Sequence, residues 1–452
     1  MACVTTVNDL RVGWVRGPGE LTTARSIMRR HRSAATRLVG LIALLVLVPL
    51  VGVAEVNSPR AEAAPVTPVT PPARTTIAGH PVWAHFANPQ ANDGRDKTIL
   101  DEVVRLIDNA PAGSTIRGTI YSLSVQPVAK ALVAAERRGV TVLALSDGKN
   151  QALTGKALSI AAELSNYRFC GYLPAEYESP TKAGGGCIST SDSGDLHVKM
   201  FTFSSTTDPK GVRRSNVVWF GSANMTYASG SDQSNNAITV YGDAALVTGL
   251  NKYFTDLWNR RHYTGNDYYN AKSGRGYYQA STATVYASPE GRGQTDTVVA
   301  RLNDVKPNAN CQVRIGMNFV TAGRPALLKL VKSLRAKKCR VWMVIGSSGG
   351  KIEMDRGVYN ALIKAGVSIR RAPAVHDKYF LVYGKFGKRY EYRVYTGSQN
   401  WSTSALTTND EIFVKMTPEL AASHPLYDGF RAHFNETWRY GRTCVKGGHP
   451  CR

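Results

Sequence analysis

The sequence predicts a protein of the α/β class, made of two similar halves whose sheets are covered by helices. Three observations support this prediction. The 452 residues are 43% hydrophobic and 20% charged, which excludes a disordered or collagen-like chain and is enough to bury a sizeable core. Segments with helical and strand periodicity alternate along the chain. The same order of segments then occurs a second time. The length alone suggests two to three domains, and the repeat indicates two domains that arose by duplication of one unit.

The first copy begins with an amphipathic helix near residues 101–109, whose apolar residues recur at helical spacing. A turn with Pro111 follows, and then an alternating strand from Ile116 to Tyr121. A second helix ends in basic residues and leads into a buried apolar strand from Val140 to Leu145. Alternation of this kind predicts a mainly parallel or mixed sheet covered by helices.

The second copy repeats these signals within residues 296–348. Val298, Val299 and Leu302 mark the amphipathic helix, and Val313 to Phe319 form the alternating strand. A basic helix and a buried strand from Val341 to Ile345 complete the unit. We therefore expect two halves related by a pseudo-two-fold axis.

Two short polar runs also occur in both copies. The His-x-Lys runs contain His197 and Lys199 in the first half and His376 and Lys378 in the second. The Gly-Ser-x-Asn runs downstream contain Ser222, Asn224, Ser398 and Asn400. The two His lie 179 residues apart and the two Gly-Ser-x-Asn runs 176 apart. A nearly constant offset is strong support for duplication, and each half then closes with an aromatic helix, at residues 253–258 and 430–438.

A pseudo-two-fold arrangement would bring both sets of polar residues to one site between the halves. His197 and Lys199 alternate along a predicted strand, so both side chains face the same way. The shared site would contain two imidazoles, two ammonium groups and two amides, which suits a phosphoryl group whose oxygens gain charge. Two His can supply a nucleophile and a general acid on opposite sides of one phosphorus atom. Lys199 and Lys378 would neutralise the phosphate, so the predicted site needs no metal and no cofactor.

These duplicated runs resemble those of the phospholipase D superfamily, over nearly all of residues 82–442. The resemblance implies two α/β/α sandwich halves that share one active site and cleave phosphodiesters without metal through a phosphohistidine. It implies that His197 is the nucleophile and His376 the acid that protonates the leaving oxygen. Carried over by position, the residues implied to bind phosphate are Lys199, Lys378, Asn224 and Asn400, together with Ser222 and Ser398.

The chain departs from the family pattern in two respects. The acid that ends the family motif, His-x-Lys-x-x-x-x-Asp, is replaced by Ser204 in the first half and by Tyr383 in the second. Family members also carry a downstream acid that orients a His. The second half supplies this acid as Glu411, whereas the first-half run aligned with it, residues 235–237, has none. We therefore expect Glu411 to reach across and hold His197, fixing its tautomer and raising its basicity.

The N-terminal region has the pattern of a secretory signal peptide. Four Arg precede seventeen nearly apolar residues at 38–54, and a small-x-small cleavage site ends at Ala63. A membrane anchor is the alternative, but the apolar run is short and contains Pro49. Translation would start at Met28, and the secreted chain would begin after Ala63.

The expected organisation places the signal region at 1–63 and a Pro/Thr-rich linker at 64–81. The first half then spans 82–262, a Tyr/Gly-rich linker 263–281 and the second half 282–452. Since one chain contains both halves, a monomer can complete the site.

Cysteine usage agrees with export to an oxidising compartment. Six Cys remain after the signal region, and they lie as near neighbours. The local pairs that we expect are Cys170 with Cys187, Cys311 with Cys339, and Cys444 with Cys451. Six Cys allow 15 connectivities, so the sequence does not decide between them. Zinc binding is disfavoured, because no Cys-x-x-Cys pair occurs.

Net charge indicates an anionic partner. The whole chain carries +23, and residues 64–452 alone carry +19. A phospholipid at a membrane surface and a nucleic acid both fit. The first interpretation is a secreted phospholipase D that hydrolyses a headgroup ester. The alternatives are a secreted nuclease of the same superfamily and a catalytically dead phosphate- or lipid-binding module. The segment 260–286, in which Arg and Lys are interleaved with Tyr, suits a lipid headgroup or a stacked base, and its simplest interpretation is a plain linker.

Overall fold

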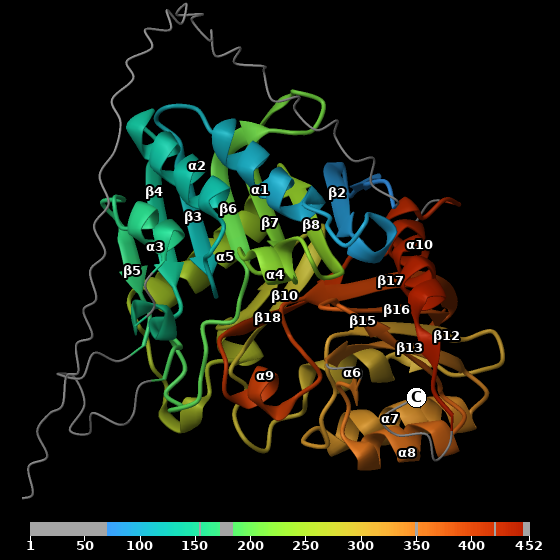
Figure 1. Ribbon diagram of the computed structural model, residues 1–452. Helices are drawn as coiled ribbons and strands as arrows, with labels where there is room; N and C mark the ends of the chain where they lie inside the picture. The colour runs from blue at the N-terminus through green and yellow to red at the C-terminus, as the bar shows by residue number, and fades with distance from the viewer. Residues whose placement is uncertain (1–69, 153–154, 172–183, 349–350, 420–421, 446–452) are drawn as a thin grey trace, which may run out of the picture. The chain divides into compact units, whose positions relative to one another are not determined.

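A computed structural model describes residues 70–152, 155–171, 184–348, 351–419 and 422–445 (Figure 1). The predicted signal peptide lies outside these residues. Within the described residues, no helix is both long and apolar enough to cross a membrane. The account below concerns the unit that begins at residue 64.

The first half is built around an eight-stranded mixed sheet in the order β1-β2-β8-β7-β6-β3-β4-β5. Its strands are β1 Ala73–Ile77, β2 His80–Ala87, β3 Thr115–Ile120, β4 Thr141–Ser146, β5 Tyr167–Phe169, β6 Met200–Thr207, β7 Arg213–Gly221 and β8 Asn235–Tyr241. β3, β4 and β5 are parallel, and the remaining neighbours are antiparallel.

The second half repeats this topology in an eleven-stranded sheet, in the order β19-β15-β13-β12-β16-β17-β18-β10-β9, with β11 and β14 at its margins. Its strands are β9 Tyr277–Gln279, β10 Ala283–Ser288, β11 Val305–Lys306, β12 Gln312–Met317, β13 Arg340–Ser348, β14 Lys351–Ile352, β15 Ser368–Pro373, β16 Lys378–Phe386, β17 Arg389–Gly397, β18 Glu411–Met416 and β19 Arg442–Thr443. Read from the other end, β10-β18-β17-β16-β12-β13-β15 corresponds strand for strand to β2-β8-β7-β6-β3-β4-β5. The predicted duplication and mixed sheets are therefore confirmed.

Helices cover both faces of each sheet. The outer helices are α1 Thr98–Asp108, α2 Gln126–Arg137 and α3 Lys156–Ala161 in the first half, and α6 Thr297–Asn303, α7 Pro325–Ala336 and α8 Arg356–Lys364 in the second. Figure 1 shows α1–α3 and α7–α8 over the outer sides of their sheets. The short helices α4 Tyr227–Gly230 and α9 Thr403–Thr407 follow the Gly-Ser-x-Asn runs.

Two longer helices, α5 Ala244–Trp258 and α10 Pro425–Tyr440, lie between the sheets. α5 contacts β10 of the other half, and α10 contacts β1 and β2 of the other half. α5 begins at Asp243, whose carboxylate accepts from the Leu246 N–H, and it buries an apolar face that includes Leu250 and Phe254. The two aromatic helices predicted from the sequence are the ends of these elements.

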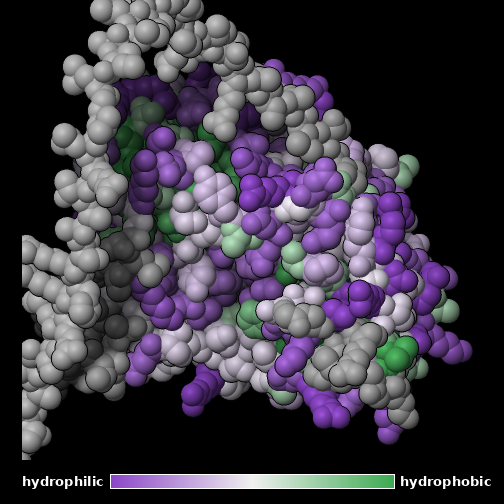
Figure 2. All heavy atoms as spheres, in the orientation of Figure 1, coloured by the Kyte–Doolittle hydropathy of each residue, from purple (hydrophilic) through white to green (hydrophobic). Residues whose placement is uncertain are grey.

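Apolar side chains gather in three cores. Two of them lie beneath the outer helices of one half each, whereas the third unites residues of both halves around α5 and α10. Figure 2 shows mostly hydrophilic side chains on the face of Figure 1, with small separate hydrophobic patches. Because the central core is shared, each half depends on the other to bury its inner face.

Two of the three predicted disulfides are present. Cys170 is joined to Cys187, and Cys311 to Cys339, with Cα atoms 4.6 Å apart in both cases. The Cys311–Cys339 bridge joins the residues that precede the parallel strands β12 and β13. Cys451 lies outside the described residues, so its pairing with Cys444 stays a prediction.

Candidate active site between the two halves

The two His-x-Lys runs lie side by side with segments of the opposite half. The His197 N–H donates to the Asp410 carbonyl at 3.0 Å, and the His376 N–H donates to the Ser234 carbonyl at 2.9 Å. Bridges between Leu196 and Asp410, and between Ser234 and Val375, complete this symmetric pair of contacts. The polar runs of both halves therefore meet in one site, as the pseudo-two-fold predicts.

The local structure differs from the strand expected at these runs. β6 begins only at Met200 and β16 at Lys378, so both His lie in extended chain just before a strand. β7 ends at Gly221 and β17 at Gly397, so the Ser and Asn that follow each lie in the loop beyond. The site is thus built at strand ends, where side chains are free of the sheet's alternation and can converge.

His197 and Glu411 meet across the halves. Nδ1 of His197 lies 2.7 Å from Oε1 of Glu411, the first residue of β18, and the Glu411 side chain has no exposed surface. This is the contact expected from the sequence, although its catalytic role stays a prediction. Burial lowers the pKa of His197, and the Glu411 carboxylate acts against that shift.

His376 has a different environment, and it corrects one sequence alignment. The Ser222 N–H donates to the Asn236 carbonyl, and in the second half the Ser398 N–H donates to the Ile412 carbonyl. Asn236 and Ile412 are therefore equivalent positions, and the residues before them, Asn235 and Glu411, are equivalent as well. The alignment of residues 235–237 with 409–411 is therefore wrong by two positions. Oδ1 of Asn235 lies 3.0 Å from Nδ1 of His376, so one His faces a carboxylate and the other a neutral amide.

The electrostatic consequence is an asymmetric pair of imidazoles. The pKa of His376 is held well below its usual value, first by burial and then by the positive charges of Lys378 and Lys199. The charged groups that most affect His376 are all positive, whereas the Glu411 carboxylate offsets burial at His197. An anion bound near the lysines would offset their charge and favour protonation of His376.

Both lysines of the motifs are buried. The exposed fractions of Lys199 and Lys378 are 1% and 2%, and each Nζ donates to the carbonyl of the preceding His, at 2.5 and 2.7 Å. Burial lowers the pKa of Lys199 to about 7 and that of Lys378 well below its usual value. The effect of burial thus outweighs that of the nearby carboxylates, and an anion bound beside the two amino groups would favour their charged form.

The Asn side chains of the two Gly-Ser-x-Asn loops are buried, as the two lysines are. Asn224 and Asn400 are buried, and neither Oδ1 atom has a hydrogen-bond partner among the described residues. The Asn224 N–H donates to Ser229 Oγ, and the Asn400 carbonyl accepts from Arg324. The two amide oxygens can therefore accept from a donor on a ligand, while the backbone is held; contact of the amide N–H groups with phosphate stays a prediction.

The two predicted phosphate-binding hydroxyls have partners in the protein. Ser222 Oγ donates to Asn235 Oδ1 at 2.8 Å, and Ser398 Oγ accepts from the Ile412 N–H at 3.1 Å. Neither side chain is exposed. In this arrangement they fasten the loops to β8 and β18, and a direct contact with phosphate stays a prediction.

Three supporting residues were missed by sequence reasoning. Tyr121 packs its ring 4.8 Å from the His197 ring, and Lys199 Nζ lies 4.8 Å from its centroid. Arg324 donates both to Asp296 and to the Asn400 carbonyl. Asp410 accepts from three backbone N–H groups of the loop at residues 187–189. Only Asp410, next to Glu411, was adjacent to a residue already singled out, so the sequence carried little signal for them.

The positions that lack the family's motif Asp lie outside this site. Ser204 is exposed on β6, where its Oγ accepts from the Thr115 N–H. Tyr383 stacks on Tyr390 and Tyr392. Within the described residues, no three His, Cys, Asp or Glu side chains are grouped as metal ligands.

Comparison with known families agrees with this geometry. The model of the family described as "Cardiolipin synthase, PLD-like domain" matches residues 103–258 and 307–438. The chain belongs to the phospholipase D superfamily, whose members are phosphodiesterases or phosphotransferases. No curated protein sequence is similar enough to count as a relative.

Several solved structures are similar to this chain at low sequence identity, and the first of those below has a TM-score above 0.5. Phosphatidylserine synthase from Haemophilus influenzae is 11% identical with a TM-score of 0.51, over 81% of this chain and 88% of its own. The phospholipase D family member Nuc from Salmonella typhimurium is 22% identical with a TM-score of 0.29, over 36% of this chain and 98% of its own. A mutant of yeast tyrosyl-DNA phosphodiesterase is 10% identical with a TM-score of 0.43, over 80% of this chain and 92% of its own.

Proposed function

We propose that the protein is a secreted phosphodiesterase that hydrolyses a phospholipid headgroup ester through a phosphohistidine at His197. The observation that carries the proposal is the contact of His197 Nδ1 with Glu411 across the two halves. This contact leaves Nε2 of His197 as the nitrogen that can attack phosphorus. The buried Lys199 and Lys378 would hold the phosphate oxygens.

The proposed reaction has two steps. Nε2 of His197 forms a bond to phosphorus while the bond from phosphorus to the headgroup oxygen breaks, and His376 donates a proton to that oxygen. Water then attacks the phosphohistidine, its proton passes to His376, and the phosphorus–nitrogen bond breaks. His376 thus returns to its protonated state and His197 to its free state.

Charge supports this assignment of roles. The pKa of His376 is lowered by burial and by the two lysines. A bound phosphodiester brings negative charge to the lysines and removes part of their repulsion, which lets His376 take up the proton that it donates. Glu411 instead stabilises positive charge on His197, as a nucleophile requires when its nitrogen bonds to phosphorus.

A lipid substrate is favoured by the matched family, whose description names cardiolipin synthase, since cardiolipin is a phospholipid. The two disulfides support work outside the cytosol. The absence of the motif Asp is compatible with activity, because the two positions lie away from the candidate site. Ser204 accepts from the Thr115 N–H, and Tyr383 stacks on Tyr392. The start after Ala63 remains part of the same proposal. The domain boundaries at 82, 263 and 282 also stay predictions, although β1 joins the first sheet from Ala73 and β9 joins the second sheet from Tyr277.

The test is turnover by the purified protein, residues 64–452, in EDTA. We expect choline release from phosphatidylcholine vesicles and an adduct on His197 when the reaction is stopped by denaturation at mildly alkaline pH, where a phosphohistidine persists. His197→Ala must fall to background, while His80→Ala, in β2 and outside the site, must keep the wild-type rate. Nicking of plasmid or single-stranded DNA without choline release would instead identify a nuclease. Salt-dependent binding of vesicles or DNA without turnover of either would identify a binding module.

A further inference from the structure

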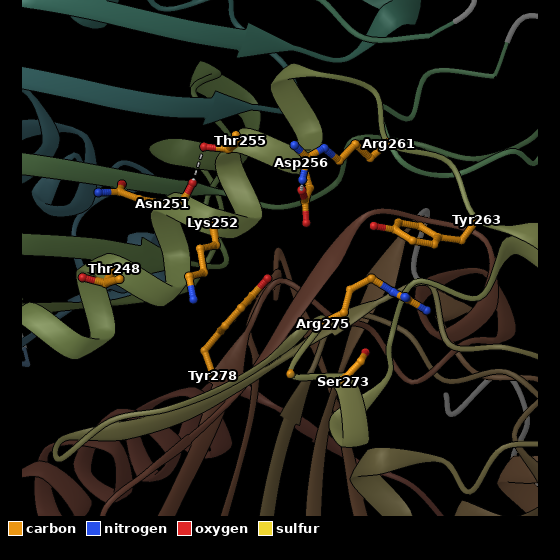
Figure 3. A pocket seen from close by; sticks show the side chains of 11 residues that line it. Thr248, Asn251, Lys252, Thr255, Asp256, Arg261, Tyr263, Ser273, Arg275 and Tyr278 are labelled. Atoms are coloured by element: carbon orange, nitrogen blue, oxygen red, sulfur yellow. Dashed lines mark hydrogen bonds and ion pairs between the residues drawn. The ribbon is translucent and has the colours of Figure 1, made fainter.

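Residues 261–278, which follow α5 and lead into the second half, form a cavity of about 700 Å³ together with one side of α5 (Figure 3). We call residues 261–278 the linker segment. α5 contributes Thr248, Asn251, Lys252, Thr255 and Asp256, and the segment contributes Arg261, Tyr263, Ser273–Arg275 and Tyr278. We call this the α5–linker cavity. None of the duplicated motif residues lines it, and its volume is within the range of small-molecule sites.

The Tyr side chains of the segment are already engaged within the protein. Tyr268 and Tyr278 are buried, and their hydroxyl groups lie 2.9 Å apart. The face of Tyr263 is covered by the Arg275 guanidinium, 3.9 Å from the ring centroid. These rings are therefore poor platforms for nucleobases, which need a free aromatic face.

The charges of the cavity do not balance. Asp256 is compensated by Arg261 at 2.8 Å and by the Tyr268 hydroxyl at 2.9 Å. Arg275 donates to the carbonyls of Tyr268 and Asp267, at 2.7 and 3.1 Å, which fixes its position without neutralising its charge. Lys252 is exposed and has no acidic partner in the described part of the chain, and Figure 3 shows its ammonium pointing into the space above Tyr278. Two positive charges are left over.

The duplication provides an internal comparison. α10 corresponds to α5, with Phe434 and Trp438 stacked as Phe254 and Trp258 are, so Ala432 is the counterpart of Lys252. A smaller hollow where β1 meets the start of α10 has Glu419 as its one charged lining residue among those described. The positive cavity therefore belongs to one half only and is not required by the shared fold.

We propose that the α5–linker cavity is a second ligand site, which binds a small phosphomonoester at Lys252, while Arg275, directed toward Tyr263 (Figure 3), adds a second positive charge to the cavity. Such a ligand carries close to two negative charges at neutral pH and three acceptor oxygens. Lys252 and Arg275 match the charge, and nearby hydroxyls of Thr248, Thr255 and Ser273 can meet further oxygens. The site lies apart from His197 and His376, so the inference goes beyond the proposed activity.

Amide hydrogen exchange with glycerol 1-phosphate as the probe tests the proposal on the mature protein. We expect slower exchange in α5 and residues 261–278, and an apparent Kd about tenfold higher in Lys252→Ala, as for loss of one charge-assisted hydrogen bond. Lys272→Ala removes an equal charge from the same segment outside the cavity and must behave as wild type. Uncharged glycerol must give no protection.

Three outcomes overturn the proposal. They are equal protection in Lys252→Ala, protection by glycerol, and protection confined to the segments around His197 and His376. The last of these would leave the proposed active site supported, so the two proposals fail independently.

Discussion

The side chains of His197 and Glu411 belong to different halves of the chain and meet at 2.7 Å. The pseudo-symmetric contact pairs His376 with Asn235 at 3.0 Å. Duplication thus produced two similar His sites, in which a carboxylate faces one imidazole and a neutral amide faces the other. A neighbouring carboxylate stabilises the positively charged imidazole and raises its pKa. A neutral amide does not, so an imidazole beside an amide loses its proton more easily.

Replacing Glu411 with Gln keeps the shape of the contact and removes its charge. We expect kcat to fall by about 10²-fold, because the attacking imidazole loses its orientation and its stabilising charge, with little change in substrate affinity. Steady-state kinetics on phosphatidylcholine measures the two effects separately. Glu163→Gln, in a surface ion pair with Arg137, serves as the control. An unchanged kcat would remove Glu411 from the mechanism.

Asn235→Asp places a second carboxylate beside His376. An opposite charge at this distance raises the pKa of an imidazole by about 1–3 units. The alkaline limb of the kcat profile, where His376 must stay protonated as the acid, should therefore move to higher pH. The exposed Asn310→Asp carries the same charge change and should leave the profile in place. A profile that does not move in Asn235→Asp argues that another group supplies the proton.

Asp410→Ser tests the anchor of the loop that carries Cys187. The Asp410 carboxylate accepts from the N–H groups of Cys187, Ile188 and Ser189, at 2.5, 3.1 and 2.8 Å. Ser is chosen as the replacement because Ser234 occupies the equivalent position in the first half. The shorter side chain leaves buried donors unpaired, which should lower the free energy of unfolding by about 2–4 kcal/mol. Urea unfolding measures this loss, and exchange at residues 184–189 should accelerate. The control Asp428→Ser breaks a surface ion pair and should cost less than about 1 kcal/mol.

Glu290→Gln tests a buried carboxyl outside the site. Burial raises the pKa of Glu290 from 4.5 to about 8, against the hydrogen bonds from Thr297. The folded protein therefore keeps a proton that the unfolded chain releases above pH 4.5, so this contribution to stability is present at low pH and lost as pH rises from 4.5 through about 8. Gln does not titrate, so the variant should gain on wild type by roughly 2–4 kcal/mol between pH 5 and pH 8. Urea unfolding at both pH values measures the gain, and a constant difference would contradict the shifted pKa.

The sequence determined the class of fold and predicted the members of the candidate site. Helical and alternating periodicities marked the elements, because the spacing of apolar residues follows from which face each element buries. The repeated His-x-Lys and Gly-Ser-x-Asn runs identified the two His, the two Lys and the two Asn that the structure brings together. Near-neighbour spacing also predicted the bridges Cys170–Cys187 and Cys311–Cys339, which are present.

Only the tertiary structure decided which residues support the site from the opposite half. The register of β8 and β18 makes Asn235 the counterpart of Glu411, a correspondence that comparison of the short runs missed by two residues. It also placed the Asp410 carboxylate under the loop at 187–189 and the Arg324 guanidinium behind Asn400. Such contacts join residues up to 223 positions apart, so no local periodicity encodes them. These contacts depend on how the two sheets pack against each other through their shared core. That packing requires both halves to be folded.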